Sequence, residues 1–134
     1  MRPDQRLPIR GEADLLAARR VVRDLAETLG FGDVQRIEIA TAVSEISRNI
    51  LNYAGEGEMT FAVVREGART GLQVRAQDHG PGIPDLTLAM SDGYSTGNGL
   101  GLGLPGARRL MDTFEITSDP TGTRITMAKW RRAW

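Results

Sequence analysis

The amino-acid sequence predicts an α/β sandwich in which a mixed, mostly antiparallel sheet carries helices packed on one face. Apolar residues recur at helical spacing over two long segments near the N-terminus, and four later segments have the strand-and-turn pattern of two hairpins. Adjacent hairpins favour antiparallel pairing, and helices segregated in this way pack on one face of the sheet. A chain of 134 residues can bury a single core, so we expect one domain over 1–134.

The N-terminal part is predicted to be mainly helical, after a short strand over 5–10. The first helix is expected over 12–29 and should end at Gly30, because its apolar side chains recur at steps of three and four residues. These side chains are Leu15, Ala18, Val22, Leu25 and Leu29. The second helix is predicted to run from Asp33, which would be its N-cap, to about Tyr53.

A first hairpin and a glycine-rich stretch are predicted next. Segments 59–65 and 72–78 have the composition of strands, and the glycine-containing segment 66–71 would be the turn between them. The stretch from 79 to about 103 is rich in glycine and contains one weak helical pattern near 85–90.

A short helix and a second hairpin complete the predicted fold. Pro105 is suited to the first turn of a helix that reaches Met111. Segments 113–118 and 123–130 are then expected to pair across a turn at 119–122.

Composition excludes several classes of function. The formal net charge is zero, so we expect neither nucleic acid nor a membrane as a partner, and the basic residues Lys129, Arg131 and Arg132 are expected to form a solvated strand end. The chain has no cysteine for disulfides or metal sites. It also has no apolar segment typical of a signal peptide or of a membrane span of about 18 residues. These observations predict a soluble, cytoplasmic protein.

Two glycine clusters indicate a nucleotide site. The first is Asp78-His79-Gly80-Pro81-Gly82, and in the second, 99–104, glycine alternates with leucine. Glycine allows backbone N–H groups to approach a ligand closely, and clustered N–H groups favour anions such as phosphate. Because an acidic residue opens the first cluster, the two clusters together suggest a nucleotide whose base is held at one end of the site and whose phosphates are held at the other.

Asp78 is expected to be buried. Leu72, Val74, Ala76 and Asp78 alternate along a strand and therefore point to one face, which the three apolar residues assign to the core. A carboxylate at the edge of the core requires a partner. The exocyclic amine of adenine and a backbone N–H in the following glycine turn are equally suitable, so the strand alone leaves both open.

The second helix brings polar residues together on one face. These are Thr41, Glu45, Arg48, Asn49 and Asn52. Such a face is usually just solvated. If Glu45 and Asn49 are buried or half-buried, however, the carboxylate can accept a proton or orient a hydroxyl, and the amide oxygen can ligate Mg²⁺.

Together these motifs resemble those of the GHKL ATPase/kinase superfamily, which includes gyrase, Hsp90, histidine kinases and MutL. Glu45-x-x-x-Asn49 resembles its N box, and Asp78-x-Gly80-x-Gly82 its first glycine box. Gly99-x-Gly101-x-Gly103-Leu104 resembles the second glycine box, and Gly122-Thr123 a weaker fourth element. The order of the four elements also matches, and the resemblance implies the Bergerat ATP-binding fold.

The resemblance implies roles for individual residues. Glu45 would be the catalytic general base, Asn49 the Mg²⁺ ligand, and Asp78 the partner of adenine N6. Gly82 would leave room for the adenine, Thr123 would contact it through water, and 92–98 would form a mobile lid. The ATP-binding residues implied are Asn49, Asp78, Gly82, Gly99, Leu100, Gly101, Leu102, Gly103, Leu104 and Thr123. ATP and Mg²⁺ are thus the implied cofactors.

Chain size and two longer segments point to one branch of the superfamily. A stand-alone domain resembles the small bacterial serine/threonine kinases of partner-switching systems, and 40–50 and 99–112 resemble the RsbT-like switch kinases of the stressosome. This implies a STAS-domain protein as substrate and a PP2C-type phosphatase as a further partner. Two alternatives stay open: an anti-sigma factor kinase that sequesters a sigma factor, and a nucleotide-dependent interaction protein with negligible transfer. Arg48 is equally suited to contact phosphates or substrate and to form a surface ion pair.

Overall fold

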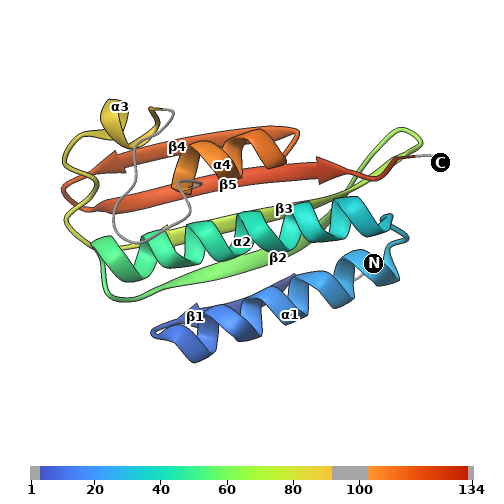
Figure 1. The fold of residues 1–134 in the computed structure, drawn as a ribbon, viewed down its shortest axis with the longest axis horizontal. Helices are drawn as coiled ribbons and strands as arrows, with labels where there is room; N and C mark the ends of the chain where they lie inside the picture. The colour runs from blue at the N-terminus through green and yellow to red at the C-terminus, as the bar shows by residue number, and fades with distance from the viewer. Residues whose placement is uncertain (1–3, 92–102, 133–134) are drawn as a thin grey trace.

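A five-stranded sheet with helices on one face forms the body of the protein (Figure 1). The computed structural model describes residues 4–91 and 103–132. In chain order, its elements are β1 (Gln5–Ile9), α1 (Glu12–Thr28), α2 (Asp33–Tyr53), β2 (Gly57–Glu66), β3 (Arg69–Asp78), α3 (Leu86–Ala89), α4 (Gly103–Leu110), β4 (Thr113–Asp119) and β5 (Gly122–Trp130).

The strand order is β1-β2-β3-β5-β4, and every neighbouring pair among these described strands is antiparallel. The predicted fold class is confirmed, but the expected mixed component of the sheet is wrong. The strands β3 and β4 do run in the same direction, because each is antiparallel to β5. Since β5 lies between them, no parallel pair forms.

The predicted helices are present, with one correction at a helix start. Gly32, not Asp33, is the N-cap of α2, and Asp33 is the first helical residue. The Asp33 carboxylate makes no capping hydrogen bond and instead pairs with Arg36, one turn further along the helix.

The first hairpin is longer than predicted because its turn is tighter: Glu66 pairs with Arg69, and Gly67 has a φ of +61°.

The core lies between the sheet and the layer formed by α1, α2 and α4 (Figure 1). The apolar face predicted for the second helix is buried, with Ile39, Val43 and Ile46 fully inaccessible to solvent. The inward face of β3 continues from apolar residues to Asp78, which is 3% exposed, as the alternation predicts. The expectation that Lys129 belongs to a solvated strand end is wrong, because it is also 3% exposed.

Candidate functional site

The predicted site residues of α2 and β3 lie at the same end of the molecule. Figure 1 shows the C-terminal half of α2 over the end of β3, and the two elements are in contact. Gly57 makes this approach possible: a Cβ added there would lie 2.9 Å from Ile50 Cγ2 and 3.1 Å from Asp78 Cβ. Asp78 is therefore packed beside the helical turn that carries Asn49.

Asp78 is held by two backbone hydrogen bonds. Its Oδ1 atom accepts from the N–H of Gly80 at 3.0 Å and from the N–H of Thr123 at 3.1 Å. The backbone partner considered from the sequence is therefore present. Because both bonds end on Oδ1, the carboxylate keeps a second oxygen for another donor, such as an exocyclic amine.

A hydroxyl pair continues the site from Asp78 toward β4. Thr123, 4% exposed, has its Oγ1 atom 2.8 Å from Oγ of Ser118, and Ser118 Oγ accepts the N–H of Ile83 at 2.8 Å. Sequence reasoning missed Ser118. The signal was available, because Phe114, Ile116 and Ser118 alternate on the inward face of β4, as the residues that lead to Asp78 do on β3.

Gly82 is required where the turn after β3 meets the turn between β4 and β5. It has a φ of +85°, and a Cβ added there would lie 2.3 Å from the carbonyl oxygen of Asp119. The neighbouring Asp119 carboxylate is fixed by Thr121, whose hydroxyl and N–H both donate to Oδ1 and lower the pKa of Asp119. The space beside Gly82 is thus filled by the chain itself, and its role in leaving room for adenine stays a prediction.

Asn49 is the most buried of the polar residues on the predicted face of the second helix. Asn49 is 6% exposed, and its Nδ2 is the only buried side-chain nitrogen or oxygen in the described part of the chain without a hydrogen-bond partner. The Glu45 side chain is 17% exposed, and its Oε1 lies 3.3 Å from Nη1 of Arg48, which confirms the ion-pair interpretation of Arg48. Thr41 is half-buried, whereas Asn52 is exposed.

The donor set is suited to Mg²⁺ rather than to a transition metal. Among residues 4–91 and 103–132, no group of three or more His, Cys, Asp or Glu side chains could hold a metal ion. Mg²⁺ keeps several waters and is commonly held by one or two protein oxygens together with phosphate oxygens. Asn49 has an amide oxygen of the required type, whereas its unpartnered Nδ2 is a donor that suits an acceptor such as a phosphate oxygen.

The predicted phosphate-binding segment is described only at its end. Gly99, Leu100, Gly101 and Leu102 lie outside the described residues, as does the predicted lid at 92–98. Gly103 begins α4 with a φ of +50°, Leu104 is 5% exposed, and Pro105 lies in the first turn, as predicted.

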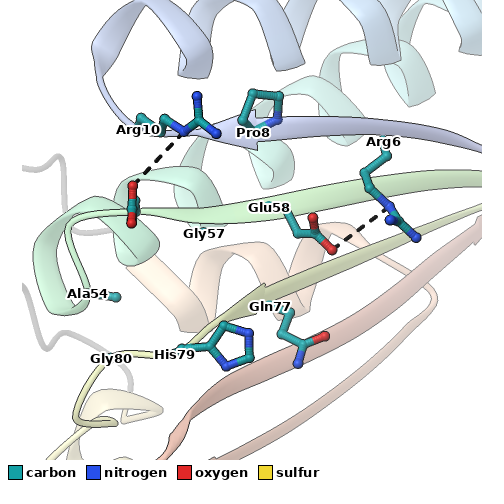
Figure 2. Close-up of a pocket in the computed structure, with 10 residues that line it drawn as sticks. Arg6, Pro8, Arg10, Ala54, Gly57, Glu58, Gln77, His79 and Gly80 are labelled. Carbon is teal, nitrogen blue, oxygen red and sulfur yellow. Dashed lines mark ion pairs between the residues drawn. The ribbon is translucent and has the colours of Figure 1, made fainter.

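A separate hollow of about 580 Å³ lies at the edge of the sheet, between β1, β2 and the end of β3 (Figure 2). His79 and Gly80 of the first glycine cluster line it, but none of the residues that were assigned an individual role does. Its charged residues already pair with one another, since Arg6 lies 3.9 Å from Glu58 and Arg10 lies 4.0 Å from Glu56. We assign no ligand to this hollow.

Comparison with known proteins agrees with the fold and motifs. A family model described as a histidine kinase-like ATPase domain matches residues 10–129. The serine/threonine-protein kinase RsbT of Bacillus subtilis (strain 168) is 48% identical over 122 residues, which cover 90% of this chain and 92% of RsbT.

Two solved structures share the fold at low sequence identity. One contains the RsbU and RsbW domains of a Mycobacterium tuberculosis protein, with a TM-score of 0.69 and 16% identity, covering 98% of this chain and 34% of that chain. The other is the SiaB–SiaC complex from Pseudomonas aeruginosa, with a TM-score of 0.56 and 10% identity, covering 96% and 89%.

These findings define the class of protein: the chain belongs to the histidine kinase-like ATPase domain family, with the GHKL fold. Within that class it is an RsbT-like serine/threonine protein kinase of the partner-switching type, and its implied nucleotide is ATP. In the described ranges, no helix is sufficiently long and apolar to cross a bilayer.

Proposed function

We propose that this kinase transfers the γ-phosphoryl group of ATP to a Ser or Thr hydroxyl of a STAS-domain protein and then binds and activates a PP2C-type phosphatase. The observation that carries the proposal is the buried amide of Asn49, whose Nδ2 has no acceptor among the described residues, one helical turn from the half-buried Glu45. The partners are inferred from the resemblance to RsbT-like switch kinases, and the kinase class from the 48% identity to RsbT.

Asn49 would hold Mg²⁺ through its amide oxygen. When bound, the ion would offset the negative charge of the phosphates. The amide group is buried and projects from a helix whose neighbouring side chains are packed in the core, so its position is restricted. A ligand held in this way costs little reorganisation when nucleotide binds.

Glu45 would accept the proton of the substrate hydroxyl or orient that hydroxyl for attack. It lies four residues before Asn49, so the two side chains are neighbours on α2. Its partial exposure lets a protein substrate reach the carboxylate, and Arg48 beside it would contact substrate or phosphate once the ion pair opens. Proton acceptance by a positioned carboxylate contributes about 10²–10⁴ in rate.

Asp78, Thr123 and Gly82 would form the adenine end of the site. Asp78 would accept the adenine N6 amine on its second oxygen while Oδ1 keeps its bonds to Gly80 and Thr123. At the other end, Gly99 to Leu104 would offer backbone N–H groups to the phosphates ahead of α4.

The test is phosphoryl transfer to a purified STAS-domain protein in the presence of ATP and Mg²⁺, with phosphosite mapping by mass spectrometry. The Glu45→Ala variant should lose about 10²–10⁴ in transfer rate while still binding ATP. Asn52→Ala is the matched control, because Asn52 is exposed on the same helix two turns further on. A Glu45→Ala protein that transfers at the wild-type rate would overturn the assignment of the base.

The phosphatase step is tested separately. Addition of the kinase to a PP2C-type phosphatase should raise its rate of dephosphorylation, and the Glu45→Ala variant should do so equally well, because binding does not need the base. Wild-type protein that binds ATP but leaves every STAS protein unmodified would favour the interaction-protein alternative.

A further inference from the structure

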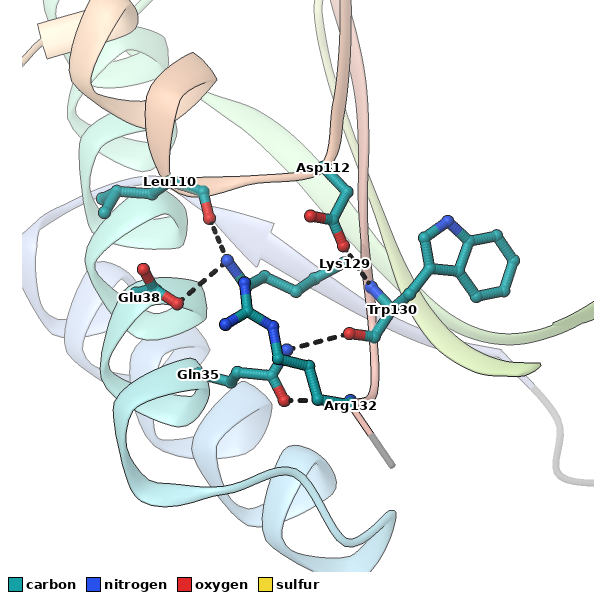
Figure 3. Close-up of polar contacts among 7 residues, drawn as sticks. All are labelled: Gln35, Glu38, Leu110, Asp112, Lys129, Trp130 and Arg132. Carbon is teal, nitrogen blue, oxygen red and sulfur yellow. Dashed lines mark hydrogen bonds and ion pairs between the residues drawn. The ribbon is translucent and has the colours of Figure 1, made fainter. Parts of the chain in front are cut away.

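The end of the α2–α4 layer remote from the candidate site contains a buried cation. Lys129 of β5 is 3% exposed and is the only lysine in a chain whose other basic residues are all arginine. Its Nζ donates to Oε1 of Glu38 in α2 at 2.9 Å and to the carbonyl oxygen of Leu110, the last residue of α4 (Figure 3). One ammonium group therefore joins three elements.

The chemistry of this contact favours lysine. The carbonyl groups at the end of a helix have no partner within the helix and carry partial negative charge, so a cation there is stabilising. An ammonium is a compact charge with three donors on a flexible stem, whereas a guanidinium is a planar fork that needs more space. Lys129 uses two of its donors, one for a carboxylate and one for the end of α4.

The same helix face that holds Lys129 also carries the proposed catalytic residues. Glu38, Glu45 and Asn49 are spaced by seven and four residues along α2, which places them on one face of the helix. Helix α4 packs against α2 and begins at Gly103, the last glycine of the second cluster. Because Lys129 ties the end of α4 to the first half of α2, the start of α4 is directed toward the half that carries Glu45 and Asn49.

We propose that Lys129 is a positioning residue, which fixes α4 against α2 and thereby sets the distance between Gly103, at the start of α4, and Asn49. The proposal rests on the proposed function, because it concerns the nucleotide site assigned there. Glu38 and Asn49 are about 16 Å apart at 1.5 Å per residue, so Lys129 acts through the two helices and not by contact with nucleotide.

A neighbouring contact provides a matched control. Gln35, 5% exposed, donates from Nε2 to the Trp130 carbonyl at 2.9 Å and accepts the Arg132 N–H at 3.3 Å (Figure 3). Gln35 thus joins α2 to β5 as Lys129 does, but these bonds do not involve α4. Loss of Gln35 should lower stability without changing the α2–α4 distance.

The experiment compares Lys129→Met with Gln35→Met by chemical denaturation and by calorimetry of ATP–Mg²⁺ binding. Both variants should unfold at lower denaturant concentration. Only Lys129→Met should weaken ATP binding, by about fivefold or more, the low end of typical coupling between two sites. Lys129→Arg, which keeps the charge but not the shape, should recover part of that loss.

Each outcome decides the proposal. If the wild-type protein binds no ATP, the proposed function fails together with it. If the wild-type protein binds ATP and Lys129→Met binds it equally well, or Gln35→Met loses as much affinity, only the positioning role is overturned. Should Lys129→Met not fold, Glu38→Gln replaces it: this variant keeps an acceptor oxygen but removes the charge, and wild-type ATP affinity in it would overturn the proposal.

Discussion

The two halves of α2 differ in how their buried polar groups are partnered. In the first half, Gln35 has two hydrogen-bond partners, and Glu38 pairs with the buried Lys129. In the second half, Nδ2 of Asn49 has no partner within the described residues. A buried polar group without a partner costs about 1–3 kcal/mol. The first half of α2 is therefore complete as a structure, whereas the second half keeps a free donor that the proposed nucleotide would use.

The largest effect on phosphoryl transfer is expected from replacing Asn49, the buried polar residue of the second half of α2. Asn49→Leu keeps the branch at Cγ and the number of side-chain heavy atoms but removes the proposed Mg²⁺ ligand, so transfer should fall by about 10²–10³, the loss typical of one electrostatic contact in an active site. Because it also removes an unpartnered amide, stability should stay constant or rise by about 1 kcal/mol. Transfer assays and urea denaturation measure the two effects.

Gln35→Met is the counterpart of Asn49→Leu in the first half of α2, where the amide has hydrogen-bond partners. It removes an amide that has partners and leaves the Trp130 carbonyl and the Arg132 N–H without theirs, so it should destabilise by about 1–3 kcal/mol with little effect on transfer. Equal stability changes for the two variants would show that both halves of α2 are complete without ligand.

Gly82→Ala should destabilise the site end by about 2–4 kcal/mol, from positive-φ strain together with overpacking against Asp119. Gly55→Ala is the control, because Gly55 has a φ of +82° with nothing within 4 Å of the added Cβ. Its cost should be strain alone, about 1–2 kcal/mol. Thermal denaturation of both variants checks the difference, and equal costs would mean that the Asp119 turn simply moves away.

Asp78→Asn sharpens the assignment at the adenine end. The new amide can still accept from Gly80 and Thr123 through Oδ1, so the fold should be retained. The second oxygen becomes an NH₂ donor that faces the adenine amine, and ATP affinity should fall about tenfold, or 1.4 kcal/mol. Calorimetry measures this, and unchanged affinity would remove Asp78 from the nucleotide site.

The smallest effect is expected at the Asp119 turn, between β4 and β5. The Thr121 hydroxyl is the main cause that lowers the pKa of Asp119 below the ordinary 3.8, so Thr121→Val should raise it toward that value. A lowered pKa of Asp119 in the folded protein stabilises the fold above pH 3.8, and this stabilisation is lost as pH falls through the pKa of the folded protein. Because Thr121→Val lacks most of this stabilisation from the start, it should lose less stability on acidification than the wild-type protein. Carboxyl-carbon NMR titration follows the shift.

Much of the candidate site was predictable because its signals are local. The alternation that ends in Asp78 placed that carboxylate in the core, and the spacing of Glu45 and Asn49 made them neighbours on a helix. The same alternation runs through Ile125, Met127 and Lys129 and places Lys129 on the inward face, whereas its charge favours a solvated strand end, so the two signals give opposite predictions. The N-cap of α2 was misplaced by one residue, since glycine at an N-cap leaves no side-chain signal.

Local sequence patterns specify the type of each element, the direction in which each side chain points, and the order of the motifs, because periods of 2 and 3.6 residues are set by the local backbone. Which buried polar groups have partners depends instead on the packing of the elements against one another. Lys129 pairs with Glu38 and Leu110, and Ser118 lies beside Thr123, because packing brings together residues from different elements. Among residues 4–91 and 103–132, Nδ2 of Asn49 has no such partner, and no local pattern shows that absence.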